Sequence, residues 1–165
     1  MNVLRFMRHL FSDRYAVRRA FPARVLRAIE AEIKLQEARH RGELRFAVEP
    51  SLPLAHLARR SAPRQRALEA FARLRVWDTE HNSGVLVYVL LADRSVEIIA
   101  DRGIAARVPQ AEWNAVCRAM QDAFRAGEFE RGALEGLRRI GALLARHFAA
   151  GPDNANELPD APVML

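Results

Sequence analysis

Carboxylate, amide and guanidinium side chains gather in two short segments of the sequence, residues 78–82 and 101–103. Carboxylate and amide oxygens in loops suit hard divalent cations such as Ca²⁺ or Mg²⁺. A bound ion would act as a Lewis acid toward a phosphoryl group, and Arg102 would hold the phosphate through paired hydrogen bonds. The candidate metal ligands are Asp78, Asp101 and Glu97.

Each of these residues also has a purely structural explanation. Asp78 would serve as a loop or cap residue, and Asp101 as a turn residue that precedes Gly103. His81 is a possible base or ligand, but a lone loop histidine is more often simply exposed. Both explanations stay open for the full set of binding candidates, which are Asp78, Asn82, Asp93, Arg94, Asp101, Arg102 and Gly103.

Two apolar runs, residues 85–91 and 95–100, are expected to bring the polar segments together. They flank a short polar turn that contains Asp93-Arg94, and this pattern is typical of a β-hairpin. Counting outward from the turn predicts that Val85 lies opposite about Asp101. The two polar segments should therefore meet at the open end of the hairpin.

The remaining pattern predicts helices on both faces of a small mixed sheet. Residues 43–48 alternate in polarity, which favours a strand with one deeply buried face. Because a helix separates this strand from residues 85–91, the two strands are expected to be parallel. The expected helices cover residues 22–40, a segment from Pro63, residues 109–126 and residues 129–148. The fold class is α/β, a three-layer α/β/α sandwich.

The chain is expected to form one domain with two extensions. Residues 1–20 contain an amphipathic helix at 3–11, which would dock on protein or on an anionic membrane. Residues 21–150 form the domain. Residues 151–165 are rich in Gly, Pro, Asn and Asp and should be extended, with Leu158 and Pro159 docking back on the domain.

The composition narrows the possible partners and compartments. The formal net charge is +6, but the arginines are scattered among acidic residues, so a solvated surface is favoured over a nucleic-acid footprint. The single cysteine, Cys117, excludes an internal disulfide and a multi-cysteine metal site. Because no apolar run has the length of a membrane span or a secretion signal, residence in the cytoplasm is expected.

Common catalytic motifs are absent from the sequence. It contains no phosphate-binding loop, no Gly-x-Ser-x-Gly, no His-Glu-x-x-His and no suitably spaced Cys–His pair. The absence of these motifs favours a binding module over an enzyme.

The order of these motifs resembles the TPM domain family over about residues 21–160. The resemblance rests on Asn82-Ser83-Gly84-Val85-Leu86, Asp93-Arg94, Asp101-Arg102-Gly103-Ile104, Phe124-Arg125-Ala126-Gly127 and the closing run 156–160. It implies an α/β/α fold, divalent-cation binding in some relatives, a proposed phosphatase activity and a LemA-like membrane protein as a partner. The chain departs from longer relatives at Phe21-Pro22-Ala23, where they carry an aspartate, and at Arg102-Gly103-Ile104, where they carry Gly-Tyr-Gly.

Three functions remain open from the sequence. The first is a non-enzymatic interaction module that serves a membrane-associated partner or makes peripheral contact with an anionic membrane. The second is a phosphatase-like hydrolase that depends on Ca²⁺ or Mg²⁺. The third and weakest is nucleic-acid binding through surface arginines.

Overall fold

The computed structural model describes residues 7, 9, 12, 14–53, 63–151 and 155–165. Its elements are α2 (Arg14–Ala20), α3 (Ala23–Glu37), β1 (Glu43–Glu49), α5 (Pro63–Arg73), β2 (Gly84–Leu90), β3 (Ser95–Ala100), α6 (Arg102–Ala105), α7 (Gln110–Arg125), α8 (Phe129–His147) and β4 (Val163–Met164). Pro22 and Pro109 occupy the N-cap positions of α3 and α7, where the missing N–H of proline costs no helical hydrogen bond. Gly127 follows α7 with φ +83°, a conformation that glycine adopts without strain.

The four strands form a mixed sheet in the order β3-β2-β1-β4. As the sequence predicts, β1 runs parallel to β2, and β2 and β3 form an antiparallel hairpin. The predicted register was off by one residue, since Val85 pairs with Ala100 and the amide of Asp101 donates to the carbonyl of Gly84. The last pair is Leu90 with Ser95, so four residues form the turn, and this turn length sets the register.

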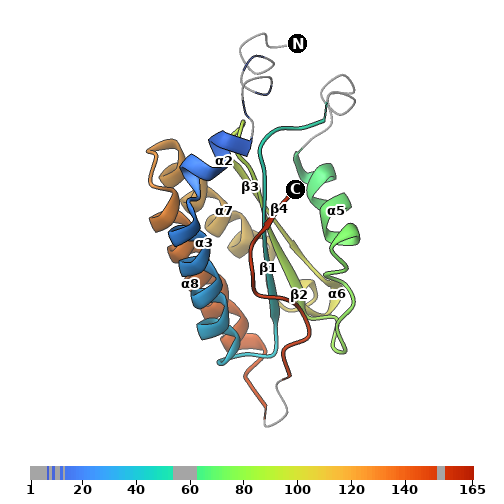
Figure 1. The fold of residues 1–165 in the computed structure, drawn as a ribbon. Coiled ribbons are helices and arrows are strands. Elements are labelled where there is room, and N and C mark those ends of the chain that lie inside the picture. The colour runs from blue at the N-terminus through green and yellow to red at the C-terminus, as the bar shows by residue number, and fades with distance from the viewer. Residues whose placement is uncertain (1–6, 8, 10–11, 13, 54–62, 152–154) are drawn as a thin grey trace.

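Helices cover both faces of the sheet, which gives the predicted α/β/α class (Figure 1). One face packs against α2, α3, α7 and α8, around a cluster in which Phe21 makes edge-to-face contacts with Phe46 and Phe124. The other face packs against α5 and the C-terminal segment. Along α8, Gly132 and Gly136 permit the close approach of α7, because a Cβ at Gly136 would lie 2.4 Å from the Met120 sulfur.

The prediction that β1 buries only one deep face was wrong. All seven residues of β1 are buried, including Glu43, Arg45 and Glu49. Two neighbours cover the second face: the C-terminal segment binds Glu43 and Arg45 and adds β4 to the edge of β1, and Arg66 of α5 binds Glu49. In the C-terminal segment Leu158 docks on the domain as predicted, whereas Pro159 stays exposed.

The N-terminal amphipathic helix predicted over residues 3–11 lies largely outside the described residues. The described part of the N-terminal extension includes α2, which buries Val17 in the core. None of the helices in the described ranges is long and apolar enough to cross a membrane.

Candidate functional site

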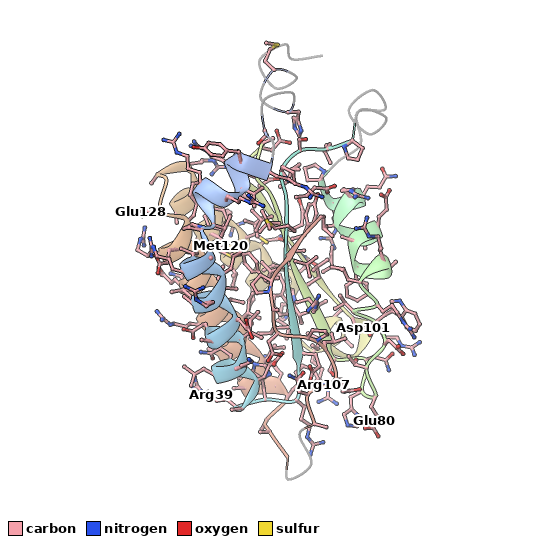
Figure 2. The ribbon with its side chains drawn as sticks, viewed as in Figure 1. Arg39, Glu80, Asp101, Arg107, Met120 and Glu128 are labelled. Carbon is pink, nitrogen blue, oxygen red and sulfur yellow. The ribbon has the colours of Figure 1, made fainter. Side chains whose placement is uncertain are left out.

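The polar segments 78–82 and 101–103 meet at one end of the sheet, where they border a pocket of about 560 Å³. We call this cavity the loop-end pocket. Its lining residues are Arg41, Glu80, His81, Asn82, Ser83, Gly103, Arg107, His147, Phe148 and Ala149. Figure 2 shows Glu80 and Arg107 together at this end of the molecule, remote from Glu128. Of the predicted binding residues, Asn82 and Gly103 therefore line one cavity.

Asn82 and Gly103 lock the two polar segments against each other. The amide of Gly103 donates to the carbonyl of Asn82 at 3.1 Å, and Arg102 Nε donates to Asn82 Oδ1 at 2.9 Å. Asn82 has φ +50°, which asparagine tolerates better than most residues. A Cβ at position 103 would lie 2.6 Å from the carbonyl oxygen of His81, so the contact requires glycine.

Ser83 places an unused hydroxyl in the wall of the loop-end pocket. The residue is 1 % exposed, and its backbone is fixed by hydrogen bonds from Ser83 N to Thr79 Oγ1 and from Glu43 N to the Ser83 carbonyl. Its Oγ has no hydrogen-bond partner within the described part of the chain. Leaving a buried hydroxyl unpaired costs free energy, and a hydrogen bond from Oγ to a ligand would recover it.

Two arginines give the pocket its positive charge. Arg41 and Arg107 are exposed, and neither forms an ion pair with a carboxylate among the described residues. The guanidinium carbon of Arg107 lies 5.0 Å from the centre of the Phe148 ring, and Nη1 reaches the His147 carbonyl at 3.4 Å. These contacts orient Arg107 without neutralising it.

Two histidines lie at this end of the sheet, one buried and one in the lining of the pocket. His40 is fully buried, its Nδ1 accepts a hydrogen bond from the Gly42 amide, and burial lowers its pKa to about 4. His147 lines the pocket, and its Nε2 has no hydrogen-bond partner in the described ranges. Since Ser83 Oγ is also without a partner, Ser83 and His147 do not form a nucleophile–base pair in this structure.

The three carboxylates predicted as metal ligands have separate partners. Asp78 forms an exposed ion pair with Arg75 at 2.6 Å, and Glu97 lies on β3 beside Arg64 at 3.5 Å. Asp101 caps α6, because its Oδ1 accepts from the amide of Arg102 at 2.7 Å. Within the described residues no group of three or more His, Cys, Asp and Glu side chains is placed to hold a metal ion. This arrangement does not fit the Ca²⁺ or Mg²⁺ site that the resemblance implies.

Asp93 and Arg94 lie in the hairpin turn, away from the loop-end pocket. His9 Nδ1 accepts from the amide of Leu52 at 3.0 Å, so the proton sits on Nε2, which donates to Asp93 at 3.1 Å. Arg94 has φ +49° and donates to the Arg125 carbonyl at 2.9 Å. Asp93 therefore attaches the turn to His9, and Arg94 attaches it to the end of α7. Nothing in the sequence indicated the contact made by His9.

Comparison with known proteins identified a matching protein family and a solved structure of similar fold. A family model described as the TPM domain matches residues 19–143. Among solved structures, the chain is similar to the NMR structure of BA42 protein from the psychrophilic bacterium Bizionia argentinensis. The TM-score is 0.78 with 28% sequence identity, over 88% of this chain and 95% of that one. A search of curated proteins gave no match.

Proposed function

The chain belongs to the TPM domain family, and from this premise we propose that it is a non-enzymatic binding module whose loop-end pocket holds an anionic group of its partner. The observation that carries the proposal is the pairing of two unneutralised guanidiniums, Arg41 and Arg107, with the unpartnered hydroxyl of Ser83 in one cavity. Guanidinium forks and a hydroxyl donor are the groups that proteins use to bind phosphate and carboxylate oxygens.

The size and the remaining lining of the pocket support this ligand class. A volume of about 560 Å³ lies within the range of small-ligand pockets. Asn82 and Gly103 supply a rigid wall, because their segments are joined by two hydrogen bonds. Glu80 is an acidic group on the rim, and its repulsion would disfavour anions that sit on that side.

A binding role is favoured over hydrolysis by the arrangement of the reactive groups. Ser83 Oγ and His147 Nε2 are not hydrogen-bonded to each other, and the carboxylates of Asp78, Asp101 and Glu97 are held by separate partners. Hydrolysis by a hydroxyl nucleophile needs a base in hydrogen-bonding reach. The cation-dependent phosphatase is therefore the alternative that the experiment below must test.

We place the anionic group on a membrane-associated partner in the cytoplasm, such as the LemA-like protein that the family resemblance suggests. Nucleic acid is disfavoured because many exposed arginines are already paired with acids. These pairs include Arg24–Glu130, Arg75–Asp78, Arg125–Asp122, Arg131–Glu128 and Arg139–Glu135. Such pairing leaves less free positive charge for a phosphate backbone.

Calorimetric titration with inorganic phosphate at constant ionic strength tests the proposal. Wild-type protein is expected to bind, and Arg41→Gln or Arg107→Gln should each weaken binding by about tenfold, the loss of one charge-assisted contact. The matched control is Arg118→Gln, which removes the same charge from an exposed residue of α7 outside the pocket. Equal affinity of all four proteins would contradict the proposal.

Two further arms separate the alternatives. Hydrolysis of para-nitrophenyl phosphate that requires Ca²⁺ or Mg²⁺ and is lost in Asp101→Ala would support the phosphatase instead. Sedimentation with vesicles containing anionic lipid distinguishes a lipid headgroup from a free phosphate. If the pocket takes the headgroup, Arg41→Gln should reduce sedimentation and Arg118→Gln should not.

A further inference from the structure

The end of the sheet opposite the loop-end pocket carries a second cavity, of about 660 Å³, between α2, the β2–β3 turn and the start of α8. Figure 1 shows α2 at the opposite end of the sheet from α6. Leu91 and Ala92 of the turn and Phe129 of α8 line the cavity with apolar groups. The Phe129 ring stacks on Phe124, with the ring centroids 5.3 Å apart. This wall is therefore held in place before any ligand arrives.

Two arginines border this apolar cavity. Arg19 comes from α2 and Arg94 from the turn, and both are exposed. Neither forms an ion pair with a carboxylate in the described ranges. Arg94 donates through Nη1 to the Arg125 carbonyl at 2.9 Å, which fixes its guanidinium beside the cavity without a negative partner. The cavity thus combines an apolar lining with two free positive charges.

The exposed face of α2 extends this positive surface. Arg14 and Arg18 are exposed and lie four residues apart, as do Tyr15 and Arg19, so they form two neighbouring rows. Both rows point away from the buried Val17. Tyr15 is 74% exposed, which leaves its ring beside the arginines and open to solvent. We call the cavity, together with Arg14, Tyr15, Arg18, Arg19 and Arg94, the turn-end surface.

The carboxylates of the elements around the turn-end surface do not balance its four arginines. Those at the end of α7, in the α7–α8 connection and at the start of α8 are paired with other arginines. These pairs are Asp122–Arg125, Glu128–Arg131 and Glu130–Arg24. Asp93 in the turn is hydrogen-bonded to His9. An excess of positive charge therefore remains at this end of the molecule.

The composition of this surface indicates the kind of partner that it fits. A second copy of the chain would present the same positive charges and would be repelled. An exposed tyrosine beside arginines is typical of side chains at the boundary between lipid headgroups and water. The apolar cavity adds the second signal that stable attachment to a bilayer requires.

We propose that the protein docks on an anionic phospholipid bilayer through the turn-end surface. The four arginines contact headgroup phosphates, the ring of Tyr15 lies among the headgroups, and the cavity takes the apolar part of one lipid. Since β2 has seven residues, the loop-end pocket then faces away from the bilayer at a distance of about 20 Å. The docking does not depend on which ligand that pocket binds.

Sedimentation of the full-length protein with vesicles at low ionic strength tests the proposal. Vesicles of phosphatidylglycerol and phosphatidylcholine should bind it, and vesicles of phosphatidylcholine alone should bind it far less. Arg19→Gln/Arg94→Gln should weaken the partition by at least about tenfold, because each arginine near an anionic surface contributes about fivefold. Arg14→Gln/Arg18→Gln should do the same and leaves the turn intact.

The matched control is Arg73→Gln/Arg118→Gln. It removes the same charge from exposed residues of α5 and α7 that lie outside the turn-end surface, so the partition should change little. Equal losses in the control and in both turn-end variants would overturn the proposal.

The ring of Tyr15 separates a bilayer from any other acidic partner. Tyr15→Ser should weaken the partition severalfold at raised salt, where the attraction of charges is screened. Equal partition of this variant and the wild type would mean attraction of charge alone, which an acidic protein would also provide. That result would overturn the bilayer as the occupant.

Brominated lipids test the orientation through tryptophan fluorescence. The native tryptophans lie outside the turn-end surface, since Trp77 follows α5 and Trp113 is buried on α7. Vesicle-bound wild type should therefore keep its fluorescence, whereas the added indole of Tyr15→Trp should be quenched. Equal fractional quenching in both proteins, or none in Tyr15→Trp, would overturn the proposal.

A last arm separates this docking from binding at the loop-end pocket. Inorganic phosphate at constant ionic strength should not release the protein from the vesicles, because it would occupy a different site. Release by phosphate would assign the lipid headgroup to the loop-end pocket and overturn the docking proposal. The calorimetric titration with phosphate decides the loop-end pocket independently.

Discussion

The loop-end pocket and the C-terminal segment, residues 155–165, which we call the strap, lie against the same sheet. They differ in whether their charged and polar side chains have partners. In the pocket, Arg41 and Arg107 stay exposed without a carboxylate partner in the described chain, and Ser83 keeps an unpaired hydroxyl. Under the strap, Glu43 and Arg45 are buried and bind backbone groups. Exposed guanidiniums without a carboxylate partner are available to a ligand, whereas buried and bonded charges fix the position of a segment.

The comparison is tested most severely at Arg45. We expect Arg45→Met to lower the free energy of unfolding by about 3 kcal/mol, because it removes the hydrogen bonds of Arg45 to the carbonyls of Pro159 and Ala161 and the positive charge that acts on Glu37 and Asp160. Urea denaturation at neutral pH measures the loss, with Arg118→Met as the exposed control. A loss as small as that of the control would mean that this charge does not hold the strap.

A second substitution tests the apolar anchor of the strap. Leu158→Ala should cost about 2 kcal/mol, since it removes most of a buried side chain. Met164→Ala is the control on the same segment, because Met164 is 45% exposed and should cost well under half as much. Thermal denaturation compares the two. Equal losses would show that burial of Leu158 does not anchor the segment.

The rigid wall of the loop-end pocket is tested at Gly103. Gly103→Ala brings a Cβ to 2.6 and 2.7 Å from the carbonyl oxygens of His81 and Asn82. The backbone must shift, so we expect a loss of about 1–2 kcal/mol together with weaker phosphate binding. In Gly127→Ala the added Cβ contacts nothing, but φ +83° strains an alanine. This variant should lose stability while its phosphate affinity stays unchanged. Unchanged phosphate affinity in Gly103→Ala would contradict a contribution of this wall to phosphate binding.

The smallest effect is expected at Asp78. Its ion pair with Arg75 is exposed, so Asp78→Asn should change stability by less than about 0.5 kcal/mol. Melting of EDTA-treated protein with and without Ca²⁺ should also be the same for wild type and variant. A Ca²⁺-dependent stabilisation that disappears in Asp78→Asn would instead establish a cation site and reopen the phosphatase alternative.

The sequence predicted elements whose signals are local. Two apolar runs around a polar turn defined the β2–β3 hairpin, and the neighbours of that hairpin included Asn82 and Gly103. Proline and glycine marked the ends of α7 within one or two residues. The register was off by one because the length of the turn depends on pairing geometry as well as on residue type.

The features that the sequence did not predict depend on contacts between distant segments. Arg41, Arg107 and His147 reach the loop-end pocket from three separate parts of the chain, and nothing in the local sequence links them. Apart from Leu158 and Pro159, the strap looked like a polar tail, because its attachment to β1 depends on the side chains of Glu43 and Arg45. Hydrophobic periodicity does not encode such polar pairings, so the burial of both faces of β1 was missed.

The most direct test of the anion-binding account is a map of amide chemical shifts during titration with inorganic phosphate at neutral pH and constant ionic strength. The account predicts saturable shifts confined to the lining of the loop-end pocket, at Arg41, residues 81–83 and Gly103, which disappear in the Arg41→Gln/Arg107→Gln double variant. Shifts scattered over the arginine-bearing helices, or the same map in the double variant, would contradict it.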